Sequence, residues 1–194
     1  MNKKRSLEKL NQSMHAMCAC PLKETAINVV PGKGSADADI VFIGEAPGKK
    51  EDKEGEPFIG AAGKFLDEML ASVKLSRDDI YITNIVKYRP PDNRDPRPEE
   101  VEDCWMWLSE QIALIDPVLI VPLGRHALER FVPGQKISEA HGKSFRREVP
   151  GLGSREYFAL YHPAAALYNG SLRETLITDF SKVPKLLEEV KKER

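Results

Sequence analysis

Four short apolar runs along the chain predict buried strands. They lie at residues 40–43, 80–83, 118–123 and 157–160, and they are rich in Val, Ile and Tyr. They do not alternate with polar residues, which is typical of strands covered on both faces of a parallel sheet. The sequence therefore predicts four parallel strands.

The segments between these runs predict helices. Apolar side chains recur at helical spacing from Phe65 to Val73 and from Val101 to Ile115. A third helix is predicted after Gly124, and residues 172–190 are predicted to form one C-terminal helix. Alternation of strands and helices indicates the α/β class, as a three-layer α/β/α sandwich around a central four-stranded parallel sheet.

Polar and turn residues gather where the predicted strands end. The first strand runs into Gly44 and Glu45, the second ends at Asn84, the third leads to Gly124 and the fourth to His162. Ligands of open parallel sheets bind beyond the carboxyl ends of the strands. This edge is therefore the predicted site.

Composition sets the broad class. The chain has 194 residues, 41% hydrophobic and 30% charged, which predicts a single soluble domain spanning residues 1–194. No apolar run approaches the ~18 residues of a membrane helix, and the N-terminal segment lacks the apolar core of a signal peptide. Three cysteines favour a reducing compartment. We expect a cytoplasmic, monomeric protein without a membrane partner.

Charge and glycine content bear on whether the chain binds a nucleic acid or a nucleotide. The net charge of −1 counts mildly against a nucleic-acid binder, although cations cluster at residues 87–97 and 141–147. The turn GEAPGKK at residues 44–50 could cradle a phosphate, but the P-loop pattern is absent and Glu45 and Glu51 would repel a triphosphate. A nucleotide-binding enzyme is therefore disfavoured.

Three side chains at this edge could recognise a planar base. The carboxamide of Asn84 could accept from N3–H of uracil and donate to O4, whereas cytosine presents the opposite pattern. His162 precedes a proline, which disfavours a helix there, and could stabilise charge on a leaving group. Phe58 could stack on the base. Alternatively, Asn84 is only a turn residue, His162 is a hydrogen-bonded histidine of the core or surface, and Phe58 packs in the core.

Three motifs in order resemble the family 4 uracil-DNA glycosylases. They are GEAPGKKEDKEGEPFIGAAG, NIVKYRPPDNRDPRPEE and YHPAAAL. The resemblance implies hydrolysis of the N-glycosidic bond of deoxyuridine in single- and double-stranded DNA, which leaves an abasic site. It implies that Glu45 activates water, that His162 donates to O2 of uracil, and that Glu51 excludes the methyl group of thymine.

The resemblance also implies the remaining contacts. Gly44, Glu51, Phe58 and Asn84 are expected to surround uracil, and residues 164–167 to push the nucleotide out of the base stack. The expected DNA contacts are Lys87, Arg89, Arg94, His141, Lys143, Ala164, Ala165, Ala166 and Leu167. His141 stands where the family usually has an arginine.

The family typically carries a [4Fe–4S] cluster on four cysteines, and this chain departs from that pattern. Met17 and Tyr88 occupy two of the four positions, and only Cys20 and Cys104 remain. Cluster iron requires thiolate ligands, so we expect no cofactor. Cys18 is poorly spaced to substitute, and Met17 and Tyr88, with Trp105 nearby, are expected to fill the space.

Two other functions stay open from the sequence. A non-catalytic protein that binds uracil-containing DNA would keep the pocket, although Glu45, Asn84 and His162 together exceed what binding needs. A metal or redox protein could use Cys18, Cys20 and Cys104.

Overall fold

The computed structural model describes residues 2–194 and has a six-stranded sheet at its centre. The strand order is β1-β3-β2-β4-β6-β5. Strands and helices follow one another along the chain as α1 (Lys3–Met17), η1 (Pro21–Glu24), β1 (Lys33–Gly34), β2 (Ile40–Gly44), α2 (Lys49–Glu54), α3 (Ala61–Ser72), β3 (Tyr81–Asn84), η2 (Pro91–Asn93), α4 (Pro98–Ile115), β4 (Leu119–Pro122), α5 (Arg125–Phe131), α6 (Ile137–Ala140), β5 (Ser144–Val149), β6 (Gly153–Phe158), α7 (Ala165–Tyr168), α8 (Ser171–Phe180) and α9 (Val183–Glu193).

The four predicted strands form the parallel centre of the sheet, β3-β2-β4-β6, so this prediction is confirmed. The edge strands β1 and β5 are antiparallel to their neighbours and were not predicted. β1 has only two residues, and β5 is mostly exposed and charged. Neither therefore carries a continuous apolar run.

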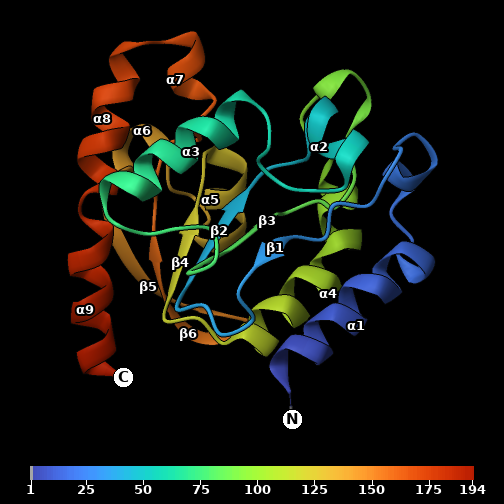
Figure 1. The fold of residues 1–194 in the computed structure, drawn as a ribbon, viewed down its shortest axis with the longest axis horizontal. Coiled ribbons are helices and arrows are strands. Elements are labelled where there is room, and N and C mark those ends of the chain that lie inside the picture. The colour runs from blue at the N-terminus through green and yellow to red at the C-terminus, as the bar shows by residue number, and fades with distance from the viewer. Residues whose placement is uncertain (1) are drawn as a thin grey trace.

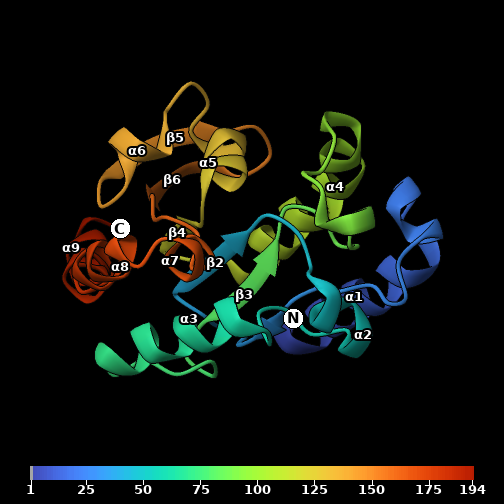
Figure 2. The same ribbon diagram turned by 90° about the horizontal axis from the view of Figure 1, so that it is seen from above.

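Helices cover both faces of the sheet, as the three-layer prediction requires (Figures 1 and 2). Val41 and Ile43 face α1, α4 and α5, whereas Ile40 and Phe42 face α3, α8 and α9. Alternating side chains of one strand thus enter two cores, which explains why β2 is apolar at every position.

The prediction of a single C-terminal helix is wrong, because this segment forms two helices, α8 and α9. They are separated at Ser181 and Lys182, and Pro184 lies in the first turn of α9. A proline lacks the N–H that a continuous helix would require at this point. No helix within residues 2–194 has the length and apolar character of a membrane span.

The carboxyl ends of the central strands face one end of the molecule. Gly44 of β2 pairs with Asn84 of β3, and Leu123 bridges to Leu160 just beyond β4 and β6. In Figure 1, α2 and α7 lie at the upper end of the molecule, whereas both chain termini lie at the lower end.

Candidate active site

Asn84 ends β3 with a buried carboxamide that has no partner. The residue is 1% exposed, and neither Oδ1 nor Nδ2 makes a hydrogen bond. Among residues 2–194, the only other buried side-chain polar atom in this state is the Tyr157 hydroxyl. Buried polar groups are nearly always hydrogen-bonded, so this amide is available to a ligand.

Gly44 leaves the space in which Asn84 and Phe58 meet. A Cβ atom at Gly44 would lie 2.5 Å from Oδ1 of Asn84 and 2.6 Å from Cζ of Phe58. Any larger residue would therefore displace one of them. Phe58 has a φ of 53°, in the left-handed region, and its carbonyl accepts a hydrogen bond from Arg77. The backbone around Phe58 is thus held in an uncommon conformation beside Asn84.

His162 lies over Phe58 with its neutral ring in a defined tautomer. The two ring centroids are 5.4 Å apart with an interplanar angle of 28°. The amide of Ala164 donates to Nδ1 at 3.1 Å, so the proton of the neutral imidazole lies on Nε2. Burial lowers the pKa of His162 to about 4. The ring is therefore a neutral N–H donor at physiological pH.

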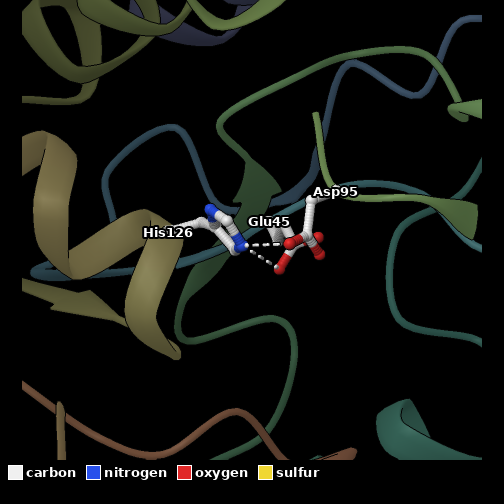
Figure 3. Close-up of side chains that lie close together, drawn as sticks. All are labelled: Glu45, Asp95 and His126. Carbon is white, nitrogen blue, oxygen red and sulfur yellow. Dashed lines mark ion pairs between the residues drawn. The ribbon is translucent and has the colours of Figure 1, made fainter. Parts of the chain in front are cut away.

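Glu45 follows β2 and lies close to two titratable side chains from other segments. Nε2 of His126 lies 3.7 Å from Oε2 of Glu45 and 3.3 Å from Oδ2 of Asp95, as Figure 3 shows. Burial raises the pKa of the Glu45 carboxyl, and His126 opposes that effect. A carboxylate with a raised pKa is suited to accept a proton from water.

The same three side chains could be read as a metal site, since their ligand atoms lie within 4.8 Å of one another. However, Nε of Arg125 donates to Nε2 of His126 at 3.0 Å and Nη2 donates to Asp95 at 2.5 Å. The guanidinium uses the acceptors that a cation would need, and it already supplies positive charge. This arrangement disfavours a metal ion.

A cavity of about 300 Å³ opens beside Glu45 and His162. Its other lining residues are Ala46, Pro47, Gly48, Pro90, Asn93, Arg94, Ala164 and Tyr168. The neighbouring Leu167 and Tyr168, at the end of α7, are 49% and 91% exposed. Two large, exposed, partly apolar side chains at the rim of a cavity are suited to contact a ligand.

Glu51 holds the start of α3 in place. Its Oε1 accepts hydrogen bonds from the amides of Ile59 and Gly60 at 3.0 and 2.7 Å. Gly60 is the N-cap of α3 and has no side chain that could cap the helix. Glu51 from α2 thus accepts from the N-cap amide itself, which is the bond that a glutamate at N3 makes in a capping box.

Replacing Glu51 with alanine should lower the free energy of unfolding by about 1–2 kcal/mol, because two amide donors lose their acceptor. Thermal or urea unfolding would measure this. Glu54 lies in the same helix, is exposed and is 3.8 Å from Lys53, so Glu54→Ala is the matched control and should change stability by less than about 0.5 kcal/mol. Equal effects of the two substitutions would contradict a capping role for Glu51.

The prediction that Lys87 contacts DNA is wrong. The side chain is 0% exposed. Its Nζ donates to Oγ1 of Thr83, the carbonyl of Asn84 and Oε1 of Gln111 at 2.6, 3.0 and 2.9 Å. Burial lowers the pKa of Lys87 to about 7. The residue is an internal support for the end of β3, and it cannot reach a phosphate.

The other predicted basic contacts of residues 87–97 lie near the cavity. Arg94 lines it and is held by both carboxylate oxygens of Glu100, at 2.8 and 2.5 Å. Arg89 is half-buried and donates to Oδ1 of Asn93 at 2.8 Å. These bonds fix the loop conformation before any ligand binds.

The second basic cluster divides into two parts along β5. Lys143 is exposed near the carboxyl end of β6, and no carboxylate of the described chain is within ion-pairing distance of it. Nδ1 of His141 lies 2.6 Å from Oδ2 of Asp179. Arg146 pairs with Glu156 instead, further from the site along the strand. Its expected phosphate contact is therefore not favoured, because the strand carries it away from the site.

Only two of the four positions at which the family typically carries cluster cysteines hold a cysteine in this chain, Cys20 and Cys104. Met17 is 70% exposed, which corrects the expectation that it fills the space. Tyr88 is buried, and its hydroxyl donates to the carbonyl of Met14 at 3.4 Å. Trp107 packs in this group, whereas Trp105 packs near Phe131 and Arg130 on the other side of α4, which corrects the placement of Trp105.

Three reduced thiols, all buried, lie in this apolar cluster. Interaction with the side chain of Cys104 lowers the pKa of Cys18 and of Cys20, and the same interactions raise the pKa of Cys104. A [4Fe–4S] cluster needs four thiolates spread around a cubane of iron and sulfide. Three thiols and the buried phenol of Tyr88 do not supply these four ligands.

Sequence reasoning missed three residues of the site: Asp95, His126 and Tyr168. His126 follows a strand end by a few residues, which is a usable signal. Asp95 and Tyr168 lie in loops and short turns whose paths no periodicity reveals.

The fold and this arrangement at the strand ends define a family. The model of the Uracil DNA glycosylase superfamily matches residues 31–189, and the chain belongs to that superfamily. Within it, the chain is 48% identical over 187 residues to the type-4 uracil-DNA glycosylase of Archaeoglobus fulgidus, covering 93% of each protein. It is 42% identical over 178 residues to that of Thermotoga maritima, covering 91% of this chain and 92% of the relative.

Relatives of a second type are more distant. The type-5 uracil-DNA glycosylase of Thermus thermophilus is 35% identical over 149 residues, which cover 69% of this chain and 68% of that protein. The higher identity and coverage place this chain with the type-4 proteins.

Proposed function

We propose that the chain is a base-excision repair enzyme that hydrolyses the N-glycosidic bond of deoxyuridine in single- and double-stranded DNA. It releases uracil and leaves an abasic site. The observation that carries this function is the unpartnered, buried carboxamide of Asn84 beside Phe58 and the neutral imidazole of His162. Its substrate partner is uracil-containing DNA inside the cell, and it acts as a monomer.

Recognition of uracil rests on Asn84 and its neighbours. The amide accepts from N3–H and donates to O4, while Gly44 gives the ring access and Phe58 stacks on one face. Cytosine would place donor against donor and acceptor against acceptor, which leaves buried groups unpaired. Glu51, adjacent to Gly48 at the cavity wall, keeps the methyl group of thymine out.

Cleavage separates charge between sugar and base. The bond from C1′ to N1 breaks with its electron pair going to uracil, and Nε2–H of His162 donates to O2 of the departing anion. Electrostatic stabilisation by a positioned donor is commonly the largest catalytic contribution. Glu45 then accepts a proton from the water that attacks C1′, so the sugar gains a hydroxyl.

Access to the base requires that the nucleotide leave the stack, at a cost of a few kcal/mol. The short segment Ala164, Ala165, Ala166 and Leu167 enters the minor groove, and the exposed Leu167 occupies the space left by the base. Arg89, Arg94, His141 and Lys143 contact phosphates on either side. This basic contribution is local, which suits a chain whose net charge is −1.

Treatment of a labelled oligonucleotide carrying one uracil tests this function. After incubation with the protein, hot alkali should cleave both the single strand and a U·G duplex at the uracil position. Strands that stay intact, together with retention of the uracil duplex in a gel shift, would indicate a binding protein instead.

We also propose that the chain works without an iron–sulfur cluster. This proposal rests on the side chains at the four ligand positions, since Tyr88 replaces one thiolate and the exposed Met17 replaces another. Protein purified without oxygen, reconstituted with ferrous iron and sulfide and then desalted should retain almost no iron and no visible charge-transfer absorption. A brown protein with a full complement of iron and sulfide would contradict the proposal.

A further inference from the structure

The carboxylate of Glu45 has a single close contact with a titratable side chain. Within residues 2–194 its side chain makes no hydrogen bond, and Nε2 of His126, at 3.7 Å, forms an ion pair with it when the imidazole is protonated. The side chain is 30% exposed, so it has room to move unless this contact restrains it. A group that activates water must be placed accurately.

His126 is itself fixed from two sides. Asp95, from the loop before α4, lies 3.3 Å from Nε2, and Arg125 donates to the same nitrogen at 3.0 Å when the imidazole is neutral. Arg125 also binds Asp95 at 2.5 Å. The start of α5 and the loop are thus tied together around one imidazole edge (Figure 3). That edge is directed at Glu45.

We propose that His126 is a positioning residue for Glu45, and that the negative charge of Asp95 opposes the charge of His126 at the Glu45 carboxylate. This inference rests on the proposed function, in which Glu45 accepts the proton of the attacking water. His126 lies outside the three sequence motifs that suggested that function, and Asp95 lies within the second of them without a role assigned to it.

The two residues act on the Glu45 carboxyl in opposite directions. Burial raises its pKa, His126 and Arg125 lower it, and Asp95 raises it. The same cavity is also lined by Arg94, which is paired with Glu100, by His162, which is neutral, and by the polar side chains of Asn93 and Tyr168. Glu45 can accept a proton from water only as a carboxylate, so activity falls as the pH drops through the pKa of Glu45.

Two substitutions should therefore move the low-pH limb of the pH profile of kcat/KM for uracil release in opposite directions. His126→Asn removes a group that lowers the pKa of Glu45, so the limb moves to higher pH and the rate at pH 5 falls roughly threefold to tenfold. Asp95→Asn removes a group that raises it, so the limb moves to lower pH. Glu129→Gln, on the exposed side of α5, is the control and should leave the limb in place.

A direct titration separates this inference from the proposed function. Carboxyl carbon NMR of the ¹³C-labelled protein, with the Glu45 signal assigned by its loss in Glu45→Gln, reports the carboxyl even if no uracil is released. Opposite shifts in His126→Asn and Asp95→Asn support the inference whatever the activity. Shifts in the same direction, or none, would overturn it, and absence of uracil release by the unmodified protein would overturn only the proposed function.

Discussion

Replacing His162 with alanine should lower the rate of uracil release by two or more orders of magnitude, about 3 kcal/mol if His162 acts like one oxyanion donor. The neutral ring carries its proton on Nε2 because Ala164 donates to Nδ1. It can therefore donate to the negative charge that develops on O2 without first gaining a proton. Single-turnover excision at saturating protein would measure the chemical step.

A control separates this role from packing. His162 stacks on Phe58, so alanine could also loosen the base pocket. His162→Phe keeps an aromatic ring but has no donor, and it should be as slow as alanine in the chemical step. Near-normal excision by either variant would move the leaving-group role to another residue.

Asn84→Leu should abolish recognition of uracil while raising stability. Leucine has the same branched outline at Cγ as asparagine, and it removes two buried polar atoms that have no partner. Leaving such a group unsatisfied costs about 1–3 kcal/mol, so the free energy of unfolding should rise by an amount in that range. Uracil excision should fall to the background rate.

Asn84→Asp provides the opposite outcome for stability. It has the same shape, but it buries a carboxylate where the two side-chain polar atoms of Asn84 have no hydrogen-bond partner. We expect it to lose both stability and excision, as urea unfolding and the excision assay would show. If Asn84→Leu destabilised the protein as Asn84→Asp does, the amide would have a structural partner and would not be reserved for a base.

The centre of the fold could be predicted because its signal is local. A strand buried on both faces, such as β2, must be apolar throughout, and α3 and α4 must repeat an apolar face. β5 could not be predicted in this way, since its exposed charged side chains resemble a loop. The break between α8 and α9 was missed because the apolar spacing continues across it, although Pro184 marked it.

Site residues could be predicted when they lie at the end of a strand. They were harder to predict when their role depends on whether the side chain is buried. Gly44 and Asn84 meet because β2 and β3 run in register. Lys87 was misread because its partners, Gln111 and Pro31, are distant in sequence. Met17 is exposed because α1 ends there and the chain turns inward at Cys18, which spacing alone does not reveal.

The most direct test of the account is to identify and count the base released from three matched duplexes that carry U·G, T·G or C·G at one position. Mass spectrometry of the supernatant and a gel run before and after alkali would suffice. We expect one free uracil per U·G duplex, an intact strand until alkali is added, and no thymine or cytosine. Release of thymine at a similar rate, or no released base at all, would contradict the assignment of the Asn84 pocket as a uracil-excision site.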